Sequence, residues 1–150
     1  MRVALRTAVA LCKRFEGLYL KPYICPGGYP TIGYGTVNKP DGTKVTMNDP
    51  PITADVAELW LIKHLERDCL PAAIKLSPNL VRRQEALGAI ADFIYNLGAS
   101  RYKTSTLRTR INQGDWEEAR YELRRWVRAN GRVLRGLELR REAEAKLLPK

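Results

Sequence analysis

Residues 15–36 decide the fold, and they read Phe15-Glu16-Gly17-Leu18-Tyr19-Leu20-Lys21-Pro22-Tyr23-Ile24-Cys25-Pro26-Gly27-Gly28-Tyr29-Pro30-Thr31-Ile32-Gly33-Tyr34-Gly35-Thr36. Eight residues lie between Glu16 and Cys25, and five lie between Cys25 and Thr31. A carboxyl, a thiol and a hydroxyl group therefore stand at fixed spacing among glycines, which let the backbone approach a ligand closely. The same segment marks the change from a helical start to a loop-rich region.

The residues on either side of Glu16 differ in pattern. Before it, apolar residues recur at helical spacing, which predicts a helix over 3–16 that Gly17 ends. After it, residues 17–51 are rich in Gly, Pro and Tyr and lack a helical period. Their turn signal at 40–42, Pro-Asp-Gly, lies between strand formers at 34–37 and 43–46, so we expect a small sheet with a hairpin there.

The rest of the chain has helical periodicity. Thr53 is placed to cap a helix that Pro71 should stop. Four further helices are expected over residues 84–97, 105–114, 115–127 and 134–148. At 150 residues the chain is long enough to bury a core without a stabilising cross-link. We therefore expect one α+β domain over 1–150, with a small β lobe at about 17–51 and a larger helical lobe.

The net charge of +10 is high for this length, and most of it falls in the last third of the chain. Such a charge suits a polyanionic partner, and nucleic acid, anionic lipid and an anionic cell wall all fit. A solvated, arginine-rich helix surface fits as well. Because the sequence has no recognition-helix or RNA-binding motif, we expect no nucleic-acid partner.

The cysteines and the N-terminus limit the other possibilities. Three cysteines cannot form a closed disulfide framework, and the spacing of Cys12, Cys25 and Cys69 matches no metal site. Cys12 and Cys69 lie in helical patterns and are expected in or near the core. The first twelve residues imitate a signal peptide, but Arg6 interrupts them, so we expect no export signal and no membrane span.

Glu16 is the candidate for acid chemistry. Cleavage of a glycosidic bond needs a proton donor for the leaving oxygen and a second group on the opposite face of the sugar. Beside an aromatic loop, removal from water would keep the Glu16 carboxyl protonated near neutral pH. The tyrosines of this region offer ring faces for sugars, although strand packing is the alternative for some of them; they are Tyr19, Tyr23, Tyr29 and Tyr34.

At this point a family resemblance becomes specific. Residues 16–36 resemble the active-site segment of the phage-type lysozymes (endolysins) of glycoside hydrolase family 24, whose pattern is Glu, eight residues, Asp or Cys, five residues, Thr. Further segments resemble that family in the same order to the C-terminus: Ile52-Thr53-Ala54-Asp55-Val56-Ala57, Gln84-Glu85-Ala86-Leu87, Phe93-Ile94-Tyr95-Asn96-Leu97-Gly98, Ser105-Thr106-Leu107, Asn112-Gln113-Gly114-Asp115, Trp126-Val127 and Gly136-Leu137-Glu138-Leu139-Arg140-Arg141-Glu142-Ala143-Glu144.

The resemblance implies a lysozyme-like fold and a set of roles. Glu16 would be the general acid, Thr31 would hold the attacking water, and Cys25 would replace the carboxylate that assists this water. Tyr34 and Asn96 would bind substrate, although Asn96 could instead cap a helix beside Gly98. One of Arg140 and Arg141 would reach Glu16.

Two positions depart from the commonest family pattern. Thr36 stands where the family commonly has His, which puts a local support contact in doubt; the only histidine, His64, is given no role. An unperturbed thiol such as that of Cys25 is only about 3% ionised at pH 7. Either nearby positive charge lowers its pKa, with Lys21 close in sequence, or a neutral thiol merely positions the water.

The resemblance implies a muramidase that hydrolyses the β-1,4 bond between N-acetylmuramic acid and N-acetylglucosamine in bacterial peptidoglycan. It would invert the anomeric carbon, need no cofactor and bind no metal. A lytic transglycosylase, which needs one acid and no water, is an alternative. A non-catalytic, cationic cell-wall-binding protein is another.

The same reading has consequences for partners and location. An enzyme made in the host cytoplasm without an export signal would need a holin-type membrane pore to reach the periplasm or cell wall. Its charge would let it bind anionic outer-membrane or wall polymers, and we expect a monomer.

Overall fold

The computed structural model describes residues 2–150. Its first element is helix α1 (Val3–Glu16). The predicted end is confirmed, because Gly17 follows Glu16 with φ +73°, a conformation that glycine adopts without strain. One face of α1 is buried, with Ala4, Ala8 and Cys12 fully inaccessible to solvent. This face lies against α4 (Gln84–Leu97).

Helix α4 is the centre of the molecule. All its residues from Ala86 to Ile94 are buried, and it contacts α1, α3 (Leu70–Leu76), α5 (Ala99–Lys103) and α8 (Arg135–Ala145). Gly88 is the point of closest approach to α1, since a Cβ atom there would lie 2.6 Å from the Thr7 Cβ and 2.7 Å from the Ala4 carbonyl oxygen. The predicted helix over 84–97 is confirmed, and its central position explains why it is apolar on nearly every face.

The small sheet pairs β1 (Tyr19–Ile24) with β2 (Pro30–Gly33) in antiparallel fashion, with Tyr23 opposite Thr31. The hairpin expected between 34–37 and 43–46 forms in shortened form. A turn lies at 40–42, Asn38 and Lys44 form an antiparallel bridge, and the Lys39 and Val45 N–H groups donate to the carbonyls of Thr43 and Val37 at 2.8 Å. The chain turns at Gly33 and Gly35, both with positive φ, before a second strand pair can extend.

Helix α2 (Ala54–His64) begins at the predicted cap, where the Thr53 hydroxyl accepts a hydrogen bond from the Val56 N–H at 3.2 Å. The expected stop at Pro71 is wrong. A π-helical turn, Leu65–Cys69, continues α2 into α3 (Leu70–Leu76), with Pro71 in the first turn of α3. The π-helical turn accommodates Pro71, because it widens the helix where proline lacks an N–H and its ring would otherwise meet the carbonyl four residues back.

The remaining elements complete the helical part. After a 3₁₀ turn (Pro78–Arg82) and α4 come α5 (Ala99–Lys103), α6 (Thr106–Gln113), α7 (Trp116–Arg124), β3 (Arg128–Ala129), β4 (Arg132–Val133) and α8 (Arg135–Ala145). The helices expected over 105–114, 115–127 and 134–148 are confirmed with shorter bounds. The short α5 and the β3–β4 hairpin were not predicted from the sequence.

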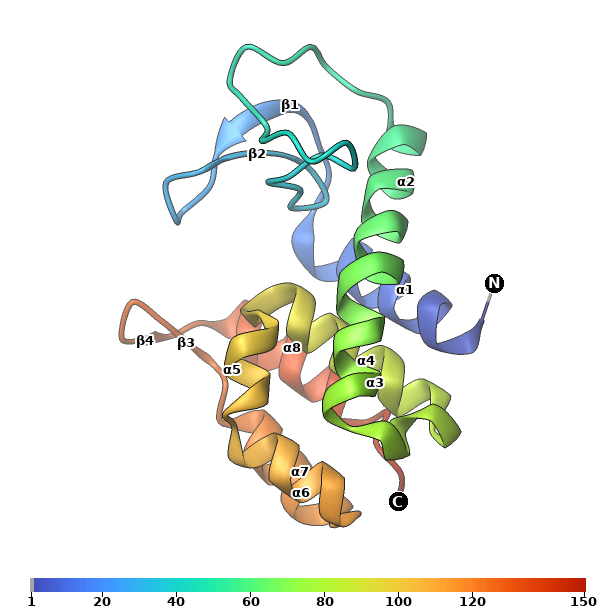
Figure 1. The fold of residues 1–150 in the computed structure, drawn as a ribbon. Helices are drawn as coiled ribbons and strands as arrows, with labels where there is room; N and C mark the ends of the chain where they lie inside the picture. The colour runs from blue at the N-terminus through green and yellow to red at the C-terminus, as the bar shows by residue number, and fades with distance from the viewer. Residues whose placement is uncertain (1) are drawn as a thin grey trace.

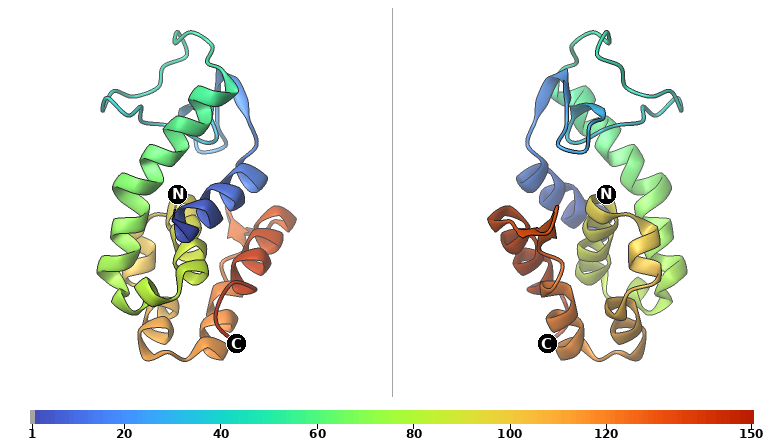
Figure 2. Two further views of the ribbon diagram at one scale, coloured as in Figure 1. Left: turned by 90° about the vertical axis from the view of Figure 1, so that its right-hand side faces the viewer. Right: turned by 90° about the vertical axis from the view of Figure 1, so that its left-hand side faces the viewer.

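Figures 1 and 2 show how these elements place the first segment of the chain. The β1–β2 hairpin and the following loop lie at one end of the molecule, and α4 to α8 form the other. Helix α1 leads from the helical part into β1, so Glu16 lies at the junction. The α+β class is confirmed. Within residues 2–150, no helix combines the length and apolar character that a membrane crossing requires.

Candidate active site

Glu16 is the last residue of α1, and its carboxyl is held by an arginine from the other end of the chain. The Arg140 Nη1 donates to Glu16 Oε2 at 2.7 Å, which identifies the member of the Arg140–Arg141 pair that reaches the acid. The Glu16 side chain is 21% exposed and that of Arg140 only 4%. The aromatic loop led us to expect removal from water around Glu16, and the family resemblance implied an arginine partner, which the structure shows to be Arg140.

Gly35 leaves room for the acid. A Cβ atom at this position would lie 2.8 Å from Glu16 Oε1, and the backbone has φ +83°. Glycine is therefore required here for two reasons, the close approach and the conformation. The turn after β2 thus forms one wall of the space around Glu16.

Cys25 follows β1 at the tip of the β1–β2 hairpin. Its N–H donates to the Tyr29 carbonyl at 3.0 Å, and its carbonyl accepts from the Gly28 N–H at 2.8 Å. Hydrogen bonding from the Thr31 hydroxyl, and then from the backbone N–H groups of Tyr29, Gly27 and Gly28, lowers the pKa of the Cys25 thiol. The pKa is thus lowered, as in one of the two alternatives left open by the sequence, but through hydrogen-bond donors and not through the positive charge of Lys21.

Thr31 lies in β2 beside Cys25 and is buried. Its hydroxyl also donates to the Tyr29 carbonyl at 2.9 Å, so the single proton is shared between two acceptors. With the thiol neutral, the S–H can donate to the Thr31 oxygen; with the thiol ionised, the hydroxyl can turn to the sulfur.

Tyr23 lies on β1 between Glu16 and Cys25 in the chain. Burial raises the pKa of its phenol, and the charges of Tyr19, Cys25 and Glu16 raise it further, so its phenol responds to both candidate catalytic groups. The rings of Tyr19 and Tyr23 stack with centroids 3.9 Å apart on β1, and Tyr29 is exposed at the hairpin.

Two predicted substrate-binding residues lie in different settings. Tyr34 is not placed to present its ring to a sugar, because it is 8% exposed and packs in the core, with its carbonyl accepting from the Tyr95 hydroxyl. Asn96 is half-buried in α4, and its Oδ1 accepts from Arg141 Nη2 at 2.9 Å. Its amide nitrogen remains available, and its side chain is not the helix cap considered above.

Thr36 stands where the family commonly has His, and His64 was given no role from the sequence. Thr36 is buried, and its hydroxyl is among the buried polar atoms that have no hydrogen-bond partner within residues 2–150. His64 is exposed on α2 and lies 3.7 Å from Asp68.

Asp92 was missed by the sequence reasoning. It is fully buried in α4 and accepts from Arg140 through Nη2 at 2.7 Å and Nε at 2.9 Å, and from the Cys12 thiol at 3.2 Å. Glu144 is equally buried and contacts Arg141. The available signal was an aspartate in an otherwise apolar helix, which indicates a buried and paired charge.

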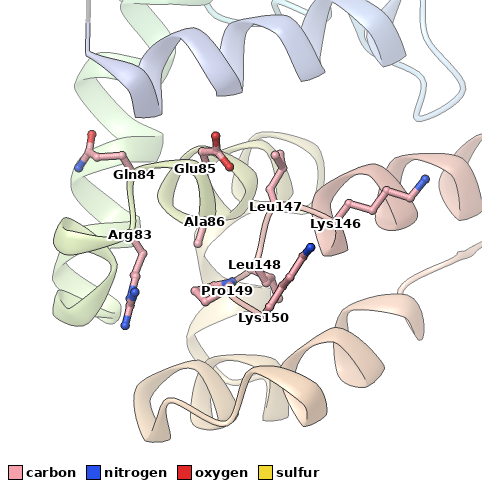
Figure 3. Close-up of a pocket in the computed structure, with 9 residues that line it drawn as sticks. All are labelled: Arg83, Gln84, Glu85, Ala86, Lys146, Leu147, Leu148, Pro149 and Lys150. Carbon is pink, nitrogen blue, oxygen red and sulfur yellow. The ribbon is translucent and has the colours of Figure 1, made fainter.

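A separate hollow of about 360 Å³ lies between the start of α4 and the C-terminal residues. Figure 3 shows Arg83, Glu85, Lys146 and Lys150 around it. Its lining includes none of the residues gathered around Glu16, so it is distinct from the candidate active site. Across residues 2–150, no group of three His, Cys, Asp or Glu side chains could hold a metal ion.

The sequence of this chain is similar to those of known proteins. Residues 13–144 match the family model described as phage lysozyme. The chain is similar to an endolysin of Acyrthosiphon pisum secondary endosymbiont phage 1, with 34% identity over 143 residues, 93% of this chain and 92% of that protein. A SAR-endolysin of Bacteriophage PS119 is 36% identical over 131 residues, 86% of this chain and 73% of that protein.

Solved structures agree with these sequence matches. An endolysin from Escherichia coli O157:H7 phage FAHEc1 superposes with a TM-score of 0.80 and 31% identity, covering 95% of this chain and 90% of that one. A P22 lysozyme variant gives a TM-score of 0.74 and 30% identity, covering 93% of each chain.

Proposed function

Because the chain belongs to the phage lysozyme family, it is a glycoside hydrolase that lyses peptidoglycan as a muramidase, and we propose that Glu16, Cys25 and Thr31 carry its chemistry. Its lysozyme-like fold is that of the phage lysozyme structures. The observation that supports the residue assignment most directly is the position of Glu16, fixed by Arg140 and within reach of the same tyrosine as Cys25.

Glu16 acts as the general acid in this proposal. In its protonated form it donates to the oxygen of the β-1,4 bond between N-acetylmuramic acid and N-acetylglucosamine, while that bond to the anomeric carbon breaks. Arg140 then donates to the carboxylate that remains. The transfer needs no cofactor.

Cys25 and Thr31 handle the water. The Thr31 hydroxyl holds a water molecule against the anomeric carbon, and the Cys25 thiolate accepts the proton as the new C–O bond forms. Because attack comes from the face opposite the leaving group, the anomeric carbon is inverted. The lowered pKa of Cys25 supports this role, since it increases the share of thiolate at neutral pH.

The cell wall is the site of action, since peptidoglycan is the substrate. We propose that a holin-type membrane pore gives the enzyme access to it, that the enzyme works in the periplasm or wall as a monomer, and that anionic wall or outer-membrane polymers bind its basic surface. The charge of +10 supports the last of these.

Digestion of purified peptidoglycan with analysis of the product ends tests the assignment. Glu16→Gln should lower kcat by about 100-fold or more, because it removes the transferable proton. Glu85→Gln, an exposed change on α4, is the matched control. Equal activity of Glu16→Gln and wild type would contradict an enzymatic role for Glu16, and 1,6-anhydro product ends would identify a lytic transglycosylase.

The role of Cys25 needs its own pair of variants in the same assay. Cys25→Asp supplies a permanently ionised acceptor at neutral pH, and Cys25→Ser supplies a hydroxyl that does not ionise there. We expect activity in Cys25→Asp and a loss of about tenfold or more in Cys25→Ser. A fully active Cys25→Ser would show that positioning of the water suffices.

A further inference from the structure

Two buried carboxyl groups have no part in the chemistry proposed above. Asp92 in α4 and Glu144 in α8 are both inaccessible to solvent. Each carboxyl group shifts the pKa of the other, so the two act on one another in the interior. Burial of ionisable groups is costly unless they are paired, so each contact of this pair has to be accounted for.

Asp92 fixes the orientation of Arg140. Its two carboxylate oxygens accept from Nη2 at 2.7 Å and from Nε at 2.9 Å. The guanidinium is planar and its donors stand in fixed directions. When two nitrogens are held on Asp92, the direction of the third, Nη1, is determined, and that nitrogen donates to Glu16 at 2.7 Å.

Glu144 and Asn96 are connected through Arg141. Its Oε2 accepts from Arg141 Nη2 at 3.0 Å, and the same nitrogen donates to Asn96 Oδ1 at 2.9 Å. Asn96 is one of the residues expected to face the sugar. Two sets of contacts therefore lead from the interior toward the site, Asp92–Arg140–Glu16 and Glu144–Arg141–Asn96, and the interaction of Asp92 with Glu144 links them.

The charges of this series also bear on the acid. Burial, the hydrogen bond with Asp92 and the charge of Asp92 raise the pKa of Glu144 well above its usual range, although Arg141 Nε, 2.7 Å from Glu144 Oε1, favours the charged form. The raised pKa favours the form of Glu144 that can donate to Asp92. Burial tends to raise the pKa of Asp92, but hydrogen bonds from Glu144 and Arg140 outweigh it and lower the pKa. Asp92 therefore carries the negative charge that balances Arg140.

This balance matters when Glu16 takes up its proton. Arg140 is almost fully buried, and with Glu16 as its sole counter-ion, protonation of Glu16 would leave a buried guanidinium unpaired. With Asp92 as a second counter-ion, Arg140 stays paired in both states of the acid. The protonated form that the reaction requires is thereby made accessible.

We propose that Asp92 is a positioning residue for the catalytic acid, and that through Arg140 it both aims and charge-balances Glu16, while Glu144 holds Asp92 in place. This inference rests on the proposed role of Glu16. It assigns a function to a buried acid pair that contacts neither the reacting bond nor the water.

Asp92→Asn is the main test. The variant keeps the shape and one acceptor but removes the charge, so kcat should fall by about tenfold to 100-fold with KM within about twofold. With Glu16 as the only remaining counter-ion of Arg140, the alkaline limb of the kcat profile should move to lower pH, by about one unit or more. Unchanged kcat and an unmoved limb in folded protein would overturn the proposal.

Other titrating groups do not imitate this shift. The groups that face Glu16 and Asp92 are Cys12 on α1, Tyr23 on β1, Tyr95 on α4, Cys69 in the π-helical turn, and Arg140, Arg141 and Glu144 on α8. The thiols and phenols among them have raised pKa values and stay neutral across the neutral range. Cys25 is present in both enzymes, so its titration cancels in the comparison.

Glu144 provides a second test that does not depend on the folding of Asp92→Asn. In Glu144→Gln an amide N–H can replace the acid proton as donor to Asp92, whereas Glu144→Leu offers no donor at similar volume. We expect kcat within about twofold of wild type for Gln and a loss of about fivefold or more for Leu. Equal kcat for the two folded variants would contradict the role of this hydrogen bond.

Two controls separate the possible failures. Glu142→Gln changes an acid of the same helix whose ion pair with Arg124 is exposed, and it should leave kcat and the pH profile unchanged. Melting temperatures establish that each variant is folded at the assay temperature. Wild-type protein that releases no product would contradict the proposed function, whereas active wild type with unaffected Asp92 and Glu144 variants would contradict this inference alone.

Discussion

The thiol of Cys25 has an environment made of hydrogen-bond donors. Thr31 and the backbone N–H groups of the hairpin tip surround it, in the manner of a small anion-binding turn. Such donors favour the thiolate without a cation, so the ionised form depends on the shape of the β1–β2 hairpin. Cys12 and Cys69, in contrast, are buried thiols whose pKa values burial raises, that of Cys69 to about 12.

These differences predict selective alkylation. In native protein Cys25 should react first with iodoacetamide, with its half-maximal rate at a pH below that of free cysteine, because the lowered pKa supplies thiolate at lower pH. Thr31→Val removes the first cause of that lowering and should move the midpoint upward. Mass spectrometry of peptides identifies the modified thiol.

Two results of the alkylation experiment would count against these expectations. Alkylation of Cys12 or Cys69 at a rate similar to Cys25 in folded protein would contradict the burial of those thiols. An unchanged midpoint in Thr31→Val would show that the backbone donors alone account for the lowered pKa. Denatured protein, in which all three thiols should react alike, is the reference.

Among single residues, the sequence predicted those site residues that lie close together along the chain. It could not predict the ones whose role depends on tertiary contacts. The spacing of Glu16, Cys25 and Thr31 belongs to one short segment, so the sequence could show it. For Asp92 the sequence offered only an acid within an apolar helix, because its partner Arg140 is 48 positions away and a helical pattern does not specify which cation meets a buried acid. Tyr34 was misplaced because the turn at Gly35 directs its ring into the core.

At the scale of elements, helix starts were predicted better than helix ends. Thr53 accepts a hydrogen bond from a backbone N–H of the helix that it was expected to cap, and Ser105 and Asp115 do the same at the starts of the helices expected from 105 and 115. These contacts are local and have a clear sequence signal. Pro71 was read as a stop, because the sequence gives no sign of the π-helical turn before it.

The contact between α1 and α4 leads to a stability prediction. In Gly88→Ala the new methyl group would meet Thr7 and the Ala4 carbonyl at under 3 Å. Overpacking costs about 1–3 kcal/mol and the better helix propensity of alanine returns up to about 1 kcal/mol, so the free energy of unfolding should fall by about 1–2 kcal/mol. Urea denaturation measures it.

Gly136→Ala in α8 is the matched control for this prediction. No atom lies within 4 Å of the position that its Cβ would occupy, so the gain in helix propensity is not opposed. Its stability should be unchanged or slightly higher. Equal effects of the two substitutions would show that the helix contact at Gly88 can relax without cost.

At the scale of the whole molecule, the charge of +10 predicts an effect of salt on lysis. Raising the salt concentration from about 0.1 M to about 1 M shortens the screening length from about 10 Å to about 3 Å. Lysis of cells with exposed anionic polymers should therefore slow several-fold, as followed by turbidity. Cleavage of peptide-free glycan chains should change less, and full lytic activity at high salt would contradict an electrostatic contribution to wall binding.

The π-helical turn has a consequence for changes in chain length. Leu70 donates its N–H to Leu65, five residues back, so this turn holds one residue more than an ordinary α-helical turn. Deleting one residue between 65 and 69 would remove this extra residue and restore an ordinary α-helical turn, so the residues after it would keep their orientation. The faces of α3 that carry Leu70 and Ala73 would then stay against α4. A second deletion in the same segment would instead rotate α3 by about 100° and take those faces away from α4. The helix from α2 to α3 can thus lose one residue at the π-helical turn but not two.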